Sequence, residues 1–197
     1  MLLRIVALLL LLALPAAAQS VETSAERLVD AAYAQIGVTR TYDPSYRRIA
    51  FPGGDVPLEA GVCSDVVVRA YRGLGIDLQR LVNDDMRRAF AAYPHLWGLT
   101  HPDPNIDHRR VANLATFFTR HGEALTISSD AKDYRPGDIV TWRLMPGNLA
   151  HIGIIADRKV EDRPLVVHNI GAGAQLEDVL FVFPITGHYR YRLATVH

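Results

Sequence analysis

The chain contains one cysteine, Cys63, in the stretch GVCSDVVVRAY at residues 61–71. A cysteine thiolate is a strong nucleophile, and a helix N-terminus or a nearby imidazolium lowers the pKa of a thiol. The apolar spacing of this stretch predicts a helix that begins at Cys63. The same spacing puts Cys63 in phase with the buried stripe of that helix. The residues therefore fit either an activated nucleophile or a packed core thiol.

Two histidines on predicted strands could act on such a thiol. His151 opens an apolar strand directly after the turn PGN at residues 146–148, and His168 ends the next strand. Pairing the strands about the turn between them places residue 153 opposite residue 168, with both histidines on one face. We expect His151 to be the general base and His168 to orient it. A register slip of one residue would make the Asn169 amide the orienting group instead.

Four ordered motifs resemble those of the NlpC-type branch of the papain-like cysteine peptidases: GVCSDVV at 61–67, RPGDIV at 135–140, AHIGI at 150–154 and VVH at 166–168. The resemblance implies a papain-like fold in which Cys63 is the nucleophile, His151 the base and His168 the orienting residue. It also implies peptidoglycan stem peptides as substrates. The chain departs from the usual pattern at Val62 and Asp65, where these peptidases usually have Asp and Gly. Through residues 97–110 and 167–173, the mature chain also resembles an exported bacterial family catalogued as a domain of unknown function.

Further side chains are candidates for substrate or oxyanion contacts: Ser64, Asp65, Tyr42, Tyr46, Asn169 and Arg109. The backbone N–H groups of Cys63 and Ser64 are also expected to line an oxyanion hole. Residues 97–110 contain histidines and aspartates, but their spacing fits no compact zinc or calcium pattern. We therefore expect no metal and no cofactor, and we interpret this segment as a lid or substrate wall.

The N-terminus has the pattern of a signal peptide at residues 1–18, with an apolar run followed by a small-residue cleavage site after Ala18. The run is short for a membrane span, so we expect an exported protein, periplasmic or secreted, without a stable span after cleavage. Cleavage removes one of the 21 basic residues and none of the 21 acidic residues. The resulting charge of about −1 gives no electrostatic basis for nucleic-acid binding. We expect one monomeric domain at residues 19–197.

The order of predicted elements is helices first and strands after, which indicates an α+β fold with an antiparallel sheet. We predict helices near residues 23–37, 63–73, 77–90 and 110–120, the first beginning with a capping box at Thr23 and Glu26 and the third capped by Asp77. We predict strands near residues 139–142, 151–156, 165–168, 179–183 and 188–193.

Together these features predict an exported thiol hydrolase that cleaves an amide bond through Cys63, His151 and His168. Two alternatives stay open. The same acyl-enzyme would make the protein an acyltransferase if an amine or alcohol replaced water. A protein with the same fold and a packed Cys63 would be a non-catalytic module for binding or maintaining the cell envelope.

Overall fold

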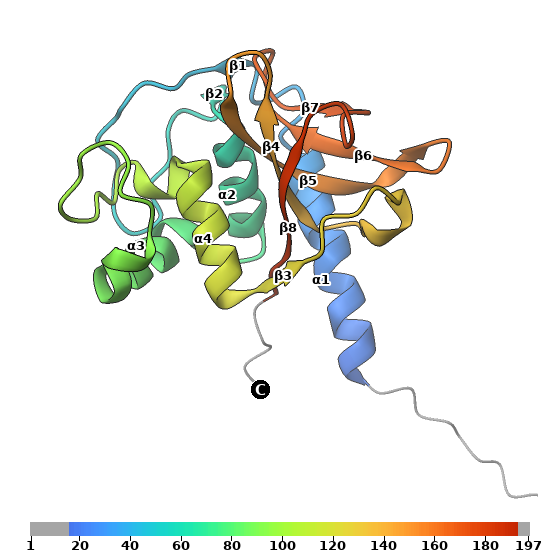
Figure 1. Cartoon of the computed structure of the whole chain (residues 1–197), viewed down its shortest axis with the longest axis horizontal. Coiled ribbons are helices and arrows are strands. Elements are labelled where there is room, and N and C mark those ends of the chain that lie inside the picture. Colours follow the sequence, from blue (N-terminus) through green and yellow to red (C-terminus); the bar gives the residue numbers. More distant parts are fainter. Residues whose placement is uncertain (1–15, 193–197) are drawn as a thin grey trace, which may run out of the picture.

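The computed structural model describes residues 16–192, with side chains described from Ser24 onward (Figure 1). Its α-helices are α1 (Ala16–Tyr33), α2 (Cys63–Gly73), α3 (Leu78–Ala89) and α4 (Val111–His121), and its short 3₁₀ helices are Phe90–Ala92, Asp107–Arg109 and Ala131–Asp133. The predicted cap of α3 is confirmed, because the Asp77 carboxylate accepts a hydrogen bond from Arg80 N.

The first helix extends further toward the N-terminus than predicted. It starts at Ala16 rather than after Thr23, since the alanines and glutamine at residues 16–19 are strong helix formers. Residues 1–15 of the expected signal peptide lie outside the described part of the chain. Within that described part, no helix is both long and apolar enough to cross a membrane.

Six strands form an antiparallel sheet in the order β3-β8-β4-β5-β6-β7. Their bounds are β3 (Glu123–Leu125), β4 (Ile139–Leu144), β5 (Leu149–Val160), β6 (Arg163–His168), β7 (Gln175–Glu177) and β8 (Ile185–Arg190). A separate parallel pair joins β1 (Thr41–Tyr42) to β2 (Ala60–Gly61) just before α2. The predicted α+β class with an antiparallel sheet is confirmed.

The pairing of β5 with β6 has the predicted register. Ile154 pairs with Val167, the alignment in which residue 153 faces residue 168. The strand predicted at residues 179–183 is wrong, because these residues form a turn closed by Val182 N and Val179 O, while the strand itself lies earlier, at β7. The apolar residues of the turn serve as a cover for the sheet. Leu180 is fully buried there, and its carbonyl accepts a hydrogen bond from Trp142 Nε1 at 2.9 Å.

Apolar packing covers both faces of the sheet. On one face, α2 contacts α1, α3 and strands β5 and β6, and Figure 1 shows α2, α3 and α4 grouped on that side. Cys63 belongs to this helical core. The other face carries a smaller cluster built from Tyr134, Val140, Trp142, Ile155, Val166 and Leu180. Because α2 points its first residue at the sheet, the fold carries Cys63 to the strands that hold the histidines.

Candidate functional site

Helix α2 begins at Cys63 because the residue three positions after the N-cap supplies the cap. The Asp65 carboxylate accepts a hydrogen bond from Val62 N at 2.6 Å. Arg109 holds that carboxylate in turn, with Nε 2.9 Å from Asp65 Oδ1 and Nη2 3.0 Å from Oδ2. Both side chains are almost fully buried. Asp65, which departs from the usual peptidase pattern, thus fixes the first turn of the helix that bears the thiol.

The expectation of a lowered thiol pKa at this helix start is wrong. Burial raises the pKa of Cys63 to about 12, against hydrogen bonds from the backbone of Ile152, Ser64 and Cys63 itself that lower it. The nearby Asp65 carboxylate raises the pKa further. The Cys63 side chain is only 3% exposed, so desolvation outweighs the favourable backbone dipoles. The resting thiol is protonated.

The two strand histidines are hydrogen-bonded to each other. His151 Nε2 lies 2.8 Å from His168 Nδ1, and the two rings are nearly perpendicular, at 78°. Burial, with a smaller contribution from His168, lowers the pKa of His151 to about 3. Burial also lowers the pKa of His168, although the Glu177 carboxylate opposes that shift. Both imidazoles are therefore neutral near pH 7.

Glu177 contacts His168 and extends this histidine pair, and no sequence pattern had identified it as a site residue. Its Oε2 lies 2.8 Å from His168 Nε2, without the alignment of a hydrogen bond. Strand β7 places it there, because His168 pairs with Gln175 and Glu177 is the diagonal neighbour on the same face. The signal in the sequence was the alternation in residues 175–177, which the predicted strand at 179–183 passed over.

The thiol meets the histidine strand through a backbone group. The N–H of Ile152, the residue after His151, is the group of β5 that points at the Cys63 thiol. Asn169 fixes this approach, because its Nδ2 donates to Gly61 O at 2.9 Å and its Oδ1 accepts from Gly171 N at 3.1 Å. Within residues 24–192, neither the thiol nor Asn169 hydrogen-bonds to His151. The structure thus places Asn169 beside the segment that precedes the thiol, and His168 beside the candidate base.

A pocket of about 290 Å³ opens next to the thiol. Its wall combines residues of the β1 region, the segment before α4 and the β4–β5 hairpin: Tyr42, Pro44, Val62, Cys63, Leu96, Trp97, Ile106, Arg109, Val111, Ala112, Arg143 and Ala150. The predicted wall at residues 97–110 therefore contributes Trp97, Ile106 and Arg109. Burial, followed by the influence of Cys63 and Asp65, raises the pKa of Tyr42 to about 12, so its hydroxyl is a protonated donor on this wall.

Other predicted site residues form hydrogen bonds to groups of the protein itself. Tyr46 does not line the pocket, because its hydroxyl donates to Asp103 Oδ2 at 3.0 Å and accepts from Asn105 Nδ2. The buried Ser64 hydroxyl donates to Arg109 O at 2.5 Å. Arg109 also donates to the carbonyls of Asp43 and Ser45, which ties the Tyr42 loop to α2.

The polar segment before α4 is held by its own side chains. Asp107 accepts a hydrogen bond from Asp103 N at 2.6 Å and pairs with Arg110, whose guanidinium lies 4.1 Å from the centre of the Trp97 ring. In the part of the chain that the structure describes, no three His, Cys, Asp or Glu side chains gather as a metal site would require.

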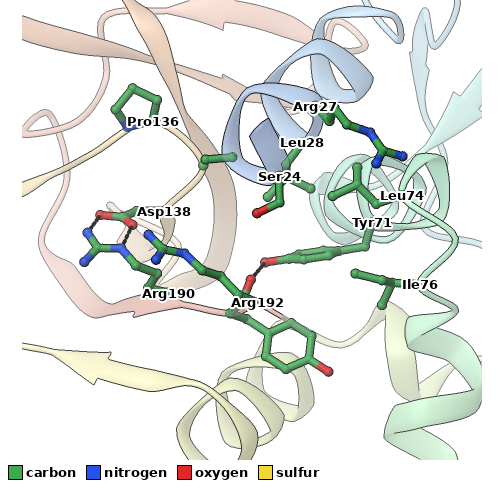
Figure 2. A pocket seen from close by; sticks show the side chains of 13 residues that line it. Ser24, Arg27, Leu28, Tyr71, Leu74, Ile76, Pro136, Asp138, Arg190 and Arg192 are labelled. Carbon is green, nitrogen blue, oxygen red and sulfur yellow. Dashed lines mark hydrogen bonds and ion pairs between the residues drawn. The ribbon is translucent and has the colours of Figure 1, made fainter. Parts of the chain in front are cut away.

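A second cavity, of about 140 Å³, lies away from the thiol between α1, the end of α2 and β8 (Figure 2). Figure 2 shows the Tyr71 hydroxyl bound to the carbonyl of Tyr191 and Arg190 engaged with Asp138. In the described chain, neither Cys63 nor His151 nor His168 lines this second cavity. The first pocket is therefore the one that reaches the thiol, while His151 and His168 lie outside its lining, near Trp142 on the other face of the sheet.

Comparison with known proteins gives one family and several relatives. Residues 29–191 match the family described as "Domain of unknown function (DUF1287)". The chain is 57% identical over 165 residues to "Uncharacterized protein YijF" of Escherichia coli (strain K12), which covers 83% of this chain and 80% of that protein. Solved structures of NlpC1 and NlpC2 from Trichomonas vaginalis match with TM-scores of 0.47 and 0.48 and identities of 19% and 20%. Each match covers 85% of this chain but only 44% and 46% of the solved chains.

Proposed function

We propose that this chain, which belongs to the DUF1287 family, is a thiol hydrolase that cleaves an amide bond with Cys63 as nucleophile and His151 as general base. The observation that carries the proposal is the buried pair His151–His168, which the half-exposed Glu177 extends; His151 lies on the strand whose backbone meets the thiol. A neutral imidazole pair is costly to bury in a core with no chemical use for it. The pocket beside Cys63 gives a substrate access to the thiol.

The contacts of His168 support one assignment of the proton positions. The Glu177 carboxylate, 2.8 Å from His168 Nε2, favours a proton on that nitrogen, which leaves Nδ1 of His168 to accept a hydrogen bond from Nε2–H of His151. The remaining nitrogen of His151, Nδ1, is then unprotonated and is the base. Glu177 acts through His168 and is a positioning residue.

In the reaction, Cys63 Sγ attacks the amide carbonyl carbon while the thiol proton passes to His151 Nδ1. The proton moves during the attack, because the resting thiol is protonated and the resting imidazole neutral. The N–H groups of Cys63 and Ser64, which face the thiol, and the Tyr42 hydroxyl on the pocket wall are our candidate donors to the developing oxyanion. The C–N bond then breaks, and the amine takes the proton from His151. Water, deprotonated by His151, hydrolyses the thioester and restores the thiol.

Peptide bonds of peptidoglycan are the proposed substrate, on the strength of the motif resemblance and the signal-like N-terminus. The test is digestion of defined muropeptides by the mature protein, with the products identified by mass spectrometry. The hydrolase releases a new amine, Cys63→Ala releases none, and His151→Gln releases it about 10³-fold more slowly. If no amine appears, or if Cys63→Ala releases as much as the wild type, the hydrolase proposal fails.

One observation favours a second candidate, a non-catalytic module that binds the cell envelope. The thiol is nearly fully buried and its pKa is raised to about 12, as for a packed core cysteine. If the protein is such a module, the wild type and Cys63→Ala should bind muropeptides equally well, and neither should form a thioester. An acyl adduct on Cys63, trapped by acid quenching and mapped by mass spectrometry, separates the two candidates.

A further inference from the structure

We propose that Arg143 binds a carboxylate of the peptide substrate in the pocket beside Cys63, so that the protein prefers acidic peptides to neutral ones. This inference rests on the proposed hydrolase function and names the chemistry of its substrate. It is carried by the charges of the pocket wall.

Two arginines line the pocket, and their surroundings differ. Arg109 is buried and fully engaged, since Asp65 neutralises it and its remaining donors bind the carbonyls of Asp43 and Ser45. Arg143 is exposed, and within residues 24–192 its guanidinium has no hydrogen bond or ion pair. No carboxylate of the described chain lines the pocket. The uncompensated charge on this wall is therefore one guanidinium.

Backbone hydrogen bonds hold the position of Arg143 on β4. Arg143 pairs directly with Ala150 across the β4–β5 hairpin, and the next pair in the ladder is Trp142 with His151. The N–H of Arg143 also donates to Pro184 O at 3.0 Å, so both sides of β4 are held at this position. Arg143 is thus one ladder step from the Trp142–His151 pair, and its side chain lies on the opposite face of the sheet from the His151 ring, the face that holds Cys63.

The other residues of the pocket wall limit which substrate groups can bind beside the carboxylate. Leu96, Ile106, Val111 and Ala112 are aliphatic, and Tyr42 and Trp97 are aromatic. A guanidinium beside apolar surface binds a carboxylate through two parallel N–H···O bonds, more strongly than neutral hydrogen bonds. This wall fits a peptide that presents an aliphatic portion and one carboxylate.

Binding is measured by fluorescence anisotropy on Cys63→Ala, which cannot turn the substrate over. The probes are three labelled peptides of one sequence: a neutral amide, the same peptide with an internal acidic side chain, and the same peptide with a free C-terminal carboxylate. We expect at least one acidic probe to bind about tenfold more tightly than the neutral probe, because hydrogen bonds to a charged group are strong. The probe that gains shows which carboxylate is recognised.

Arg143→Gln in the same background should remove that preference, while Arg87→Gln, an exposed arginine on α3 away from the pocket, should retain it. Arg143→Glu should reverse the preference toward a lysine-containing peptide. Equal binding of all three probes, or a preference that survives Arg143→Gln, overturns the inference. Amine release by the wild type is measured separately, so the hydrolase proposal can stand or fall on its own.

Discussion

Two buried histidine clusters lie on the same sheet, and their electrostatics differ. At the start of β4, Asp138 accepts hydrogen bonds from His188 Nε2 at 2.8 Å and from Arg190 at 2.7 and 2.8 Å, and from Arg135 N at 2.9 Å. At the start of β5, His151 and His168 bond to each other, and their acid partner, Glu177, is 43% exposed. The first cluster is compensated inside the fold, and the second is two neutral bases, one of them on the strand whose backbone meets the thiol.

This difference separates a structural cluster from the one that we propose to be reactive. Burial raises the pKa of Asp138, but hydrogen bonds from His188 and Arg190 outweigh it, so the carboxylate stays ionised and locks three chain segments together. The pKa values of His151 and His168 are lowered instead, because burial is not matched by an equally buried carboxylate. A base kept neutral is available for proton transfer at neutral pH.

The largest effect is expected from His151→Gln. Loss of a general base lowers kcat/KM for amide hydrolysis by about 10³-fold, whereas the free energy of unfolding changes by less than about 1 kcal/mol because a neutral buried ring is replaced by a smaller neutral amide. Amine release and urea unfolding measure the two quantities. Severe unfolding with normal activity in the folded fraction would assign this cluster a structural role.

Asp138→Asn should show the opposite behaviour. Removing the carboxylate leaves Arg190 and His188 without their buried partner, which costs about 3 kcal/mol of stability, while activity per folded molecule stays within twofold. Asp178→Asn is the matched control, because its ion pair with Arg163 is partly exposed and contributes below about 1 kcal/mol. A loss of kcat in the folded Asp138→Asn protein would remove the distinction between the clusters.

Sequence patterns predicted most of the scaffold for a physical reason. Period and capping residues located α2, α3 and α4. The predicted register near His151 and His168 is also found, although a bulge between Ile155 and Lys159 shifts the ladder away from the register set at the turn. These features depend on neighbours close in sequence. The strand at β7 was misplaced, because Val179, Leu180 and Val182 have strand-like composition but fold as a turn whose Leu180 covers the sheet.

The chemistry of the site was less predictable, because it depends on burial. A helix start predicts a lower pKa for Cys63, but the fold desolvates the thiol and the net shift is upward. The same holds for Asp65 and Arg109, which were candidates for substrate contact and form an internal ion pair. Only the packed structure shows which charges neutralise each other.

Acid should destabilise the protein through its neutral histidines. Burial lowers the pKa of His151 to about 3. Burial is also the largest influence on His108, whose pKa is lowered to about 4. An unfolded histidine has a pKa near 6.5. The unfolded chain therefore binds more protons below pH 6.5, and stability falls as the pH falls toward 4. Each imidazole contributes up to about 1.4 kcal/mol per pH unit, so urea unfolding of His151→Gln should show a shallower pH dependence. An unchanged slope would mean that His151 is already charged in the fold.

The smallest predicted effect tests how far the reactive cluster extends. Glu177 is the neighbour that raises the pKa of His168, and its negative charge stabilises the imidazolium that forms on His151 during proton transfer. Glu177→Gln should therefore lower kcat by about fivefold, a loss near 1 kcal/mol, and move the acid limb of the pH–rate profile to lower pH. A merely structural residue would change stability and leave that limb in place. Asp178→Asn, one residue along, should alter neither, since its carboxylate pairs with Arg163. If Glu177→Gln and Asp178→Asn gave the same profile as the wild type, the series would end at His168, and the tautomer of His151 would be set by that ring alone.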